Sequence, residues 1–358
     1  MDPVRFGVVG YKGTALPWLD VINDEPDAVL IAVADREPGR TAEIVKRRGA
    51  LFEDDDRALL IHHRLDVVVV ALSPAGVERV LPTAAEHGVA ALLESPPARS
   101  FEEALASTKR FEEAGLPLLV CSGWRLDDAL AGFRQMESRF GPVIQASAHV
   151  SKPLPAPLGW RADRVRAGGG VLASAAYDAL DMLLDVMGLP ADVLATVRRV
   201  GYPSAQPYDV EDAATLMMRY DDNTVATVIA RWGPPPEQAV VHLSGRGGCI
   251  TVANGVLTIH DPDEAASNDA PKRVVYGKKT DSAPRPAERT RAVRAIIDAL
   301  RSVPNKSEPP HGATTALRDH LPTVAVLESA YLSARTGEPE PPHQAYERSG
   351  VTPPVRHA

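Results

Sequence analysis

The chain has 358 residues with a formal net charge of −8, and 44% of its residues are hydrophobic. This length suits two domains, and the absence of a long Lys/Arg run argues against a nucleic-acid or membrane-surface partner. Two distant cysteines, no membrane-spanning apolar run and no signal-peptide pattern at Met1–Arg5 together favour the cytoplasm.

The first third of the chain alternates apolar strands with helices. Strands are predicted at 5–10, 29–34, 67–72, 90–93 and 116–121, and helices at 14–24, 41–48, 76–86 and 101–113. Strands joined through helices form a parallel sheet, and the unbroken apolar run at 67–72 is typical of a strand buried on both faces. Residues 1–122 are therefore predicted to be a doubly wound, Rossmann-type α/β domain.

The pattern changes near residue 123. After a helix at 127–140, strands follow one another at 143–150, 193–200, 213–220, 224–232, 239–244, 249–253, 256–260 and 274–276. Such strands pair mainly antiparallel, and Asp221-Asp222-Asn223 predicts a hairpin turn. With helices at 287–301 and 314–336, we expect an α+β domain at 123–338 with a large, open sheet. Residues 339–358 are interpreted as a proline-rich tail.

The turn after the first strand has the features of a phosphate site. It reads Gly10-Tyr11-Lys12-Gly13-Thr14-Ala15, which follows the G-x-G-x-x-G/A pattern at its first and third positions. Free N–H groups and the helix dipole at such a turn attract phosphates. Lys12 departs from the pattern where glycine is usual, and we expect Gly13 and the Lys12 ammonium to compensate.

The acidic residue of this pattern is also present. Asp35 ends the second strand, 20 residues after Ala15, where a carboxylate binds ribose hydroxyls and repels a 2′-phosphate. Arg36 beside it could attract such a phosphate, so NAD is the expected cofactor and NADP stays open. The alternative is an ordinary strand–helix turn beside a solvated aspartate.

With these residues in place, the chain resembles the Gfo/Idh/MocA oxidoreductases, named for glucose-fructose oxidoreductase, inositol dehydrogenase and a rhizopine-catabolism protein. The similar segments are Val68–Pro74, Leu92–Pro97 at the place of Glu-Lys-Pro, Trp160–Asp181, which is similar to W-R…G-G-G-x-L-x-D-x-G-x-H-x-x-D, and Leu327–Gly337. The resemblance implies that cofactor and substrate meet between the domains, and that homo-oligomers pair through the open C-terminal sheet. It places Leu72, Ser73, Pro74, Glu94 and Ser95 beside the cofactor.

The resemblance also locates the proton-transfer residues. In the family, the Lys of Glu-Lys-Pro, an Asp and a His handle the proton that accompanies hydride transfer. The matching positions are Ser95, Ser174 and Asp178. Serine is a poor base, and an aspartate with a pKa of about 3.9 is a weak one unless burial raises it. Asp178 and its neighbour Tyr177 are the catalytic candidates, with a packed aromatic as the alternative for Tyr177.

Further residues border the substrate cleft that the resemblance implies. They are Ser95, Arg125, Lys152, Trp160, Arg161, Ser174, Tyr177 and Asp178. Arginine binds carboxylate or phosphate well, so the expected substrate is a small, polar molecule, and an anionic one fits. We expect Ser95, Ser174, Tyr177 and Asp178 to line one cleft, the last three on a helix at 171–188. No zinc or Walker spacing occurs, and no metal is expected.

Three functions compete on these observations. The first is an NAD(P)-dependent oxidoreductase with a non-standard proton donor. The second is a dinucleotide or metabolite sensor without catalysis, which the replacement of three catalytic positions favours. The third is a lyase, hydrolase or isomerase that uses NAD transiently. The fold alone does not separate them.

Overall fold

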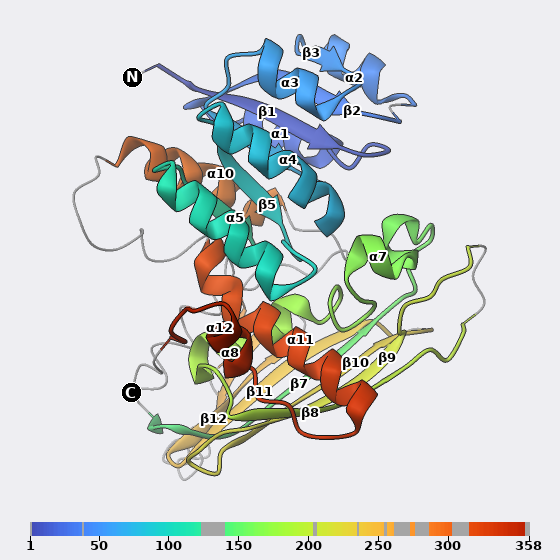
Figure 1. Cartoon of the computed structure of the whole chain (residues 1–358), viewed down its shortest axis with the longest axis vertical. Coiled ribbons are helices and arrows are strands. Elements are labelled where there is room, and N and C mark those ends of the chain that lie inside the picture. Colours follow the sequence, from blue (N-terminus) through green and yellow to red (C-terminus); the bar gives the residue numbers. More distant parts are fainter. Residues whose placement is uncertain are drawn as a thin grey trace. The chain divides into compact units, whose positions relative to one another are not determined.

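The computed structural model describes residues 2–37, 39–122, 140–202, 206–234, 236–253, 256–260, 273–275, 286–302 and 315–354. The chain forms two compact units, shown in Figure 1. The first comprises Met1–Leu126 and Ala283–Asp319, and the second comprises Asp127–Ser282 and His320–Ala358. The chain therefore leaves the first unit, returns to it and ends in the second.

The first unit contains a seven-stranded sheet in the order β15-β6-β5-β4-β1-β2-β3. Its strands are β1 (Val4–Gly10), β2 (Ala28–Asp35), β3 (Leu51–Glu53), β4 (Val67–Val70), β5 (Ala90–Glu94), β6 (Leu118–Cys121) and β15 (Thr315–Ala316). Strands β1 to β6 pair in parallel, and β15 adds to β6 antiparallel. The predicted doubly wound parallel sheet is confirmed. Sequence analysis missed the short strand β3.

Helices cover both faces of this sheet. They are α1 (Leu16–Asn23), α2 (Thr41–Arg47), α3 (Asp56–His62), α4 (Pro74–Glu86), α5 (Phe101–Glu113) and α10 (Pro286–Arg301). The packing of β4 explains why all its residues are apolar. Val67 and Val69 lie in one core cluster, whereas Val68 and Val70 lie in the other. Successive side chains of a strand point to opposite faces, so a strand between two helical layers needs apolar residues at every position.

Helix α10 packs beside α1 in the first of these clusters, where Ile296 lies with Trp18 and Ile22. The domain boundaries predicted from the sequence place this helix in the second domain, at 123–338. Its contacts group it with the first unit instead, because its apolar face completes the cover of the Rossmann sheet. A helix so far along the chain carries no local signal of the sheet on which it packs.

The second unit contains an eight-stranded sheet in the order β14-β13-β12-β11-β7-β10-β9-β8. Its strands are β7 (Val143–Lys152), β8 (Asp192–Arg198), β9 (Ala213–Arg219), β10 (Val225–Trp232), β11 (Gln238–Gly245), β12 (Gly248–Ala253), β13 (Val256–His260) and β14 (Arg273–Val275). Only β7 and β10 pair in parallel among these strands, so the mainly antiparallel sheet is confirmed. The hairpin at Asp221-Asp222-Asn223 joins β9 to β10, with Asn223 at a φ of 66°.

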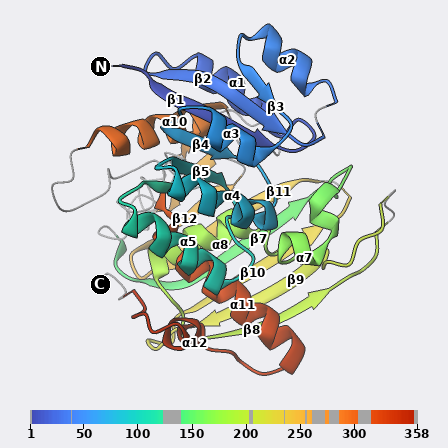
Figure 2. The same cartoon turned by 45° about the horizontal axis from the view of Figure 1, so that its top comes forward.

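The helical elements of this unit are η1 (Gly159–Ala162), α7 (Arg164–Ala167), α8 (Tyr177–Met187), α11 (Leu321–Thr336) and α12 (His343–Arg348). Figure 2 shows α8 and α11 over the same face of the sheet. In β10, Val228 and Trp232 are buried beneath this layer, whereas Ile229 points to the opposite face and is 45% exposed.

Three local predictions need correction. Residues 171–176 form turns and α8 begins only at Tyr177, so the helix expected at 171–188 is shorter. The helix expected at 314–336 is preceded by β15 and the 3-10 turn η2 (Leu317–His320), and the helix itself is α11. In the segment interpreted as a tail, Glu340 bonds to the backbone of Val193, and Tyr346 of α12 is 2% exposed.

The glycine run at 168–170 is explained by packing within the second unit. A Cβ atom on Gly169 would lie 1.9 Å from the Tyr331 hydroxyl, and one on Gly170 would lie 1.9 Å from the Glu211 carbonyl oxygen. The buried Glu211 carboxylate also accepts hydrogen bonds from the N–H groups of Gly170 and Leu172, at 2.8 and 3.1 Å. The backbone thus approaches protein groups here, which gives these glycines a structural reason.

We predict that Gly170→Ala destabilises the second unit by about 3 kcal/mol or more, because the backbone of Glu211 cannot yield as a side chain would. The free energy of unfolding from urea denaturation measures this. Gly201→Ala is the control: its Cβ meets nothing within 4 Å, and only the φ of 82° opposes it. That variant should lose about 1–2 kcal/mol. Equal losses in the two variants would contradict the packing explanation.

Candidate functional site

The turn between β1 and α1 is tightly built. A Cβ atom on Gly10 would lie 2.7 Å from the backbone nitrogen of Ala15, so only glycine lets strand and helix approach this closely. Lys12, at the position where the pattern has glycine, adopts a left-handed φ of 53°, and Gly13 has a φ of 85°. Thr14 Oγ1 accepts a bond from the Tyr11 N–H at 2.7 Å and donates to the Ala71 carbonyl at 2.6 Å. The turn is therefore fastened to the end of β4.

Asp35 lies at the end of β2 beneath this turn, and only 1% of the residue is exposed. Its Oδ1 accepts the N–H groups of Lys12 and Glu37, both at 3.0 Å, and its Oδ2 accepts that of Gly13 at 2.9 Å. Burial of a carboxylate requires such partners. Two carboxylate oxygens offer about four acceptor positions. The geometry thus leaves Asp35 with acceptor capacity for one further hydroxyl.

The side chains next to Asp35 are paired with one another at the surface. Lys12 Nζ lies 3.2 Å from the Glu37 carboxylate, and the Tyr11 hydroxyl donates to the same carboxylate. The hydrogen bond to Glu37, helped by one to Tyr11, raises the pKa of Lys12. Both partners of the Lys12–Glu37 pair are more than half exposed, and exposed ion pairs of this kind stabilise a structure little.

Arg36, the residue that could hold a 2′-phosphate, is already engaged by acidic side chains. Its guanidinium lies 3.0 Å from Asp55 and 2.7 Å from Asp56, and Arg79 binds the other oxygen of Asp56. Burial opposes ionisation of Asp56, yet the hydrogen bonds from Arg79 and Arg36 lower its pKa below the usual value. The charge of Arg36 is thereby balanced by Asp55 and Asp56 and is less available to a 2′-phosphate, which favours NAD over NADP.

The residues after β4 serve as the start of α4. The Ser73 hydroxyl accepts the Gly76 N–H at 3.2 Å and caps the helix, and Pro74 is its first residue. Leu72 packs against Gly76, because a Cβ there would lie 2.8 Å from the Leu72 Cβ. Leu72, Ser73 and Pro74 thus lie at the carboxyl end of β4, and their contact with the cofactor stays a prediction.

Glu94 ends β5, and its carboxylate is held from one side. Its Oε1 accepts the Trp18 indole N–H at 3.0 Å and lies 3.5 Å from the Arg289 guanidinium. Arg289 comes from α10, is 6% exposed and lies over the Trp18 ring, 5.4 Å from its centre. Ser95 follows Glu94 and precedes Pro96 through a cis peptide bond. Sequence analysis missed Trp18 and Arg289, which no local motif marks.

Gly10, Asp35, Ser73 and Glu94 follow or end four neighbouring strands at the same edge of one parallel sheet. The strand order reverses between β1 and β4, and dinucleotides bind in the crevice at such a reversal. The close turn at Gly10 and the acidic residue at the end of β2 both fit NAD. These residues of the first unit could hold its phosphates and ribose.

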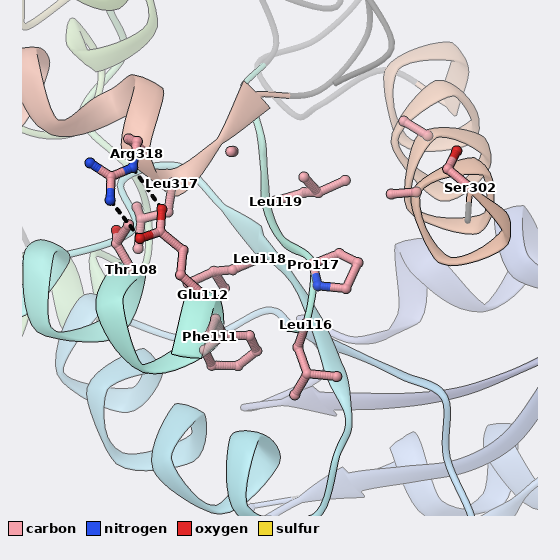
Figure 3. A pocket seen from close by; sticks show the side chains of 13 residues that line it. Thr108, Phe111, Glu112, Leu116, Pro117, Leu118, Leu119, Ser302, Leu317 and Arg318 are labelled. Atoms are coloured by element: carbon pink, nitrogen blue, oxygen red, sulfur yellow. Dashed lines mark hydrogen bonds and ion pairs between the residues drawn. The ribbon is translucent and has the colours of Figure 1, made fainter. Parts of the chain in front are cut away.

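The first unit also has an apolar cavity of about 300 Å³, shown in Figure 3. It is lined by Thr108, Phe111, Glu112, Leu116, Pro117, Leu118, Leu119, Ala295, Ala299, Ser302, Ala316, Leu317 and Arg318. Arg318 and Glu112 form a two-bond ion pair at 2.5 and 2.6 Å. Residues 116–119 enter and begin β6, whereas the nucleotide residues follow the carboxyl ends of their strands. This cavity is therefore separate from the predicted dinucleotide site.

The proton-transfer candidates of the second unit differ in exposure. Asp178 and Ser174 are half-buried, and the Ser174 hydroxyl donates to the Gly170 carbonyl at 2.6 Å. Tyr177 has no exposed surface, and its hydroxyl lies 3.2 Å from Nδ1 of the equally buried His320. The structure thus places Tyr177 in the core of this unit, as the packed aromatic of the alternative interpretation. Its role as a substrate-contacting proton donor does not agree with this burial.

His320 belongs to a buried polar cluster below Tyr177. Its Nδ1 lies 3.1 Å from Asp181 Oδ1, and the Thr323 hydroxyl donates to the same oxygen at 2.7 Å. All four side chains are sealed from solvent, and a buried polar network holds only when its members bond to one another. Asp181, the last aspartate of the family-like segment, therefore joins α8 to α11.

The remaining substrate-side candidates lie apart in the second unit. Lys152 ends β7 and is half-buried, and Trp160 and Arg161 lie in η1 with the guanidinium 4.3 Å from the indole centre. Arg125 lies outside the described residues, as does most of the helix predicted at 127–140. Ser95 belongs to the first unit, so its expected grouping with Ser174 and Asp178 stays a prediction.

In the described part of the chain, no group of three or more His, Cys, Asp or Glu side chains is arranged to hold a metal ion. None of the helices described is both long and apolar enough to cross a membrane.

Comparison with known proteins gives matches along most of the chain. Residues 4–122 match the model of an oxidoreductase family with an NAD-binding Rossmann fold, and residues 136–251 match the GFO/IDH/MocA C-terminal domain. A D-apiose dehydrogenase from Paraburkholderia graminis is 25% identical over 332 residues, which are 89% of this chain and 84% of that protein.

Solved structures share the fold over nearly the whole chain. The WlbA dehydrogenase from Bordetella pertussis, in complex with NADH and UDP-GlcNAcA, is similar with a TM-score of 0.77 and 21% identity, covering 95% of this chain and 98% of that one. A levoglucosan dehydrogenase in complex with NADH and levoglucosan has a TM-score of 0.78 and 20% identity, with 95% and 99% covered. The matches of residues 4–122 and 136–251 to the family models, with which the strand order and the Asp35 turn agree, show that the chain belongs to the Gfo/Idh/MocA family of NAD-binding oxidoreductases.

Proposed function

We propose that this protein is an NAD-dependent dehydrogenase that acts on a small, sugar-like molecule. The observation that carries the proposal is the Asp35 carboxylate, fixed by three backbone N–H groups at the edge where a parallel sheet binds nucleotides. The relatives support the substrate class, since they are named for apiose and levoglucosan and one structure contains a sugar nucleotide.

NAD, when bound, carries the hydride, and the protein orients the reacting groups. Asp35 is the proposed acceptor for a ribose hydroxyl. For the cofactor to reach it, the exposed contacts of Glu37 with Tyr11 and Lys12 must break. Once Glu37 has turned away, the Lys12 ammonium is available to the diphosphate. These surface contacts are weak, so their opening opposes binding little.

Asp178 is the proposed base for the substrate hydroxyl. It takes the position of the family's histidine, is half-buried near the start of α8 and has the only ionisable side chain at the three replaced positions. Ser95 and Ser174 lack a basic group and would contact the substrate through hydrogen bonds. Trp160, Arg161 and Lys152 are proposed contacts for a polar substrate, and an anionic group would suit the two cations.

The open face of the second sheet is the proposed contact between copies of the chain in a cytoplasmic homo-oligomer. Helices α8 and α11 cover one face, while the outward side chains of β9 and β10 include Met217, Thr227 and the 45% exposed Ile229. An exposed row that mixes apolar and small polar side chains suits pairing with another protein surface.

We predict that the protein binds NADH at least about tenfold more tightly than NADPH, because Asp35 repels the 2′-phosphate and Arg36 is held by Asp55 and Asp56. Titration calorimetry with both cofactors measures this. Arg36→Leu should leave the NADH:NADPH ratio unchanged, since its guanidinium serves the two aspartates. If this variant weakens NADPH binding selectively, Arg36 reaches the phosphate and the assignment to NAD is wrong.

A second prediction separates Asp178 from Tyr177. Asp178→Asn should lower kcat by about 100-fold or more, through loss of the base, with little change in the Kd for NADH. The sugar-like substrate is first found by screening levoglucosan, D-apiose and UDP-linked sugar acids for NADH formation. Tyr177→Phe is the matched control: it should retain kcat but lose about 1–3 kcal/mol of stability, because His320 loses one of its buried partners and keeps Asp181.

The screen has two outcomes that would contradict the proposal. Full activity in Asp178→Asn would exclude this carboxylate as the base. NADH binding without turnover of any sugar or sugar derivative would favour the sensor function instead. Myo-inositol and glucose serve as the reference substrates, and turnover of either should be very slow without the family's Lys and His.

A further inference from the structure

Among the described residues, the Glu94 carboxylate has partners at one of its two oxygens only. Both described partners of its carboxylate, the Trp18 indole N–H and the Arg289 guanidinium, meet the same oxygen, Oε1. Oε2 receives no hydrogen bond from the described residues, and the side chain is 25% exposed, whereas that of Arg289 is 8% exposed. The carboxylate therefore has an inner oxygen fixed by the protein and an outer oxygen able to accept a hydroxyl.

The strand order tells which part of the cofactor this oxygen serves. Asp35 ends β2, on one side of the reversal between β1 and β4, and Glu94 ends β5, on the other side. A dinucleotide lies across such a reversal, with one nucleotide half on each side. If Asp35 binds the adenosine ribose, Glu94 lies on the side of the nicotinamide half.

We propose that Arg289 is a positioning residue that, with Trp18, fixes Glu94 so that its Oε2 accepts a hydroxyl of the nicotinamide ribose. The inference rests on the proposed NAD-dependent function and assigns a new role to a side chain of α10. The family's lysine is replaced by Ser95 next to Glu94, and Arg289 brings a cation to this carboxylate from another part of the chain.

The chemistry of the cluster suits arginine. The guanidinium carbon lies over the Trp18 ring, 5.4 Å from its centre, and Nη2 lies 3.5 Å from Glu94 Oε1, so one side chain contacts both Trp18 and the carboxylate. Arginine stays charged in a site of low exposure and stacks on aromatic rings, whereas lysine is a compact, strongly hydrated cation. Helix α10 holds Arg289 firmly, because its apolar face is packed in the core of the first unit.

Binding of NADH and ADP to the purified, full-length chain tests this role. ADP contains the adenosine half and lacks the nicotinamide ribose. Arg289→Met and Glu94→Gln should each weaken NADH binding about tenfold, as expected for a lost charge-assisted hydrogen bond, and leave the Kd for ADP unchanged. A structural defect in the Rossmann unit would weaken both ligands, so the difference between them isolates the positioning role.

Arg294→Met is the matched control. Arg294 lies on the same helix and forms an ion pair at 2.8 Å with Glu25, away from Glu94. This variant should bind both ligands as the wild type does. If Arg289→Met does not fold, Trp18→Phe removes the indole N–H while keeping an aromatic ring, and should also weaken NADH binding but not ADP binding.

A double variant decides whether Arg289 acts through Glu94. The tenfold loss from Arg289→Met should disappear in the Glu94→Gln background, because the group it positions is then altered. An unchanged NADH affinity in Arg289→Met, equal weakening of NADH and ADP, or full additivity in the double variant would each overturn the proposal. If the wild-type chain binds neither NADH nor ADP, the proposed function itself fails, and this outcome is distinct from the other three.

Discussion

The nucleotide end of the first unit is organised around a buried carboxylate that needs hydrogen-bond donors. Asp35 obtains three of them from the backbone of residues 12, 13 and 37, which fixes the turn after β1 and the chain after β2 relative to each other. Because a buried carboxylate without donors is costly, the turn holds its shape even though Lys12 adopts a conformation that favours glycine. The pattern's second glycine is thus dispensable here, and its replacement brings an ammonium group to the surface beside the site.

The second unit also contains a buried carboxylate that needs hydrogen-bond donors, that of Glu211. Burial raises the pKa of this carboxyl, while bonds from Tyr331 and from the N–H groups of Gly170 and Leu172 act in the opposite direction. The segment at 168–172 and helix α11 are therefore joined through one side chain. Two of the family-like segments, Trp160–Asp181 and Leu327–Gly337, are thus connected through buried side chains: Tyr331 donates a hydrogen bond to Glu211, which holds the backbone at Gly170 and Leu172, and Thr323 at the start of α11 donates one to Asp181.

Sequence patterns predicted those parts of the fold whose signal is local. The valines of β4 indicated a strand between two layers, and Asp35 was identified by its distance from the glycine turn. The role of Arg289 had no such signal, because it depends on α10 packing beside α1, far away in the sequence. Tyr177 shows the opposite case. Its neighbour Asp178 takes the position of a catalytic residue in the family and is half-buried, whereas Tyr177, one residue earlier on α8, lies in the core. The sequence did not show which of the two side chains points into the core, because the predicted helix begins at residue 171, six residues before α8.

The proposed cofactor residues and the proposed proton-transfer residues lie in different parts of the chain. In the first unit, Gly10, Asp35 and Glu94 are the proposed dinucleotide contacts, and the charge of Arg36 is balanced by Asp55 and Asp56. At the positions to which the resemblance assigns proton transfer, the chain has Ser95, Ser174 and Asp178. Hydride transfer depends on the cofactor and its orientation, whereas the base must suit the acidity of the particular substrate. A different substrate would therefore require different proton-transfer residues while the residues that hold the cofactor stayed the same, and the proposed roles of Ser95, Ser174 and Asp178 fit this division.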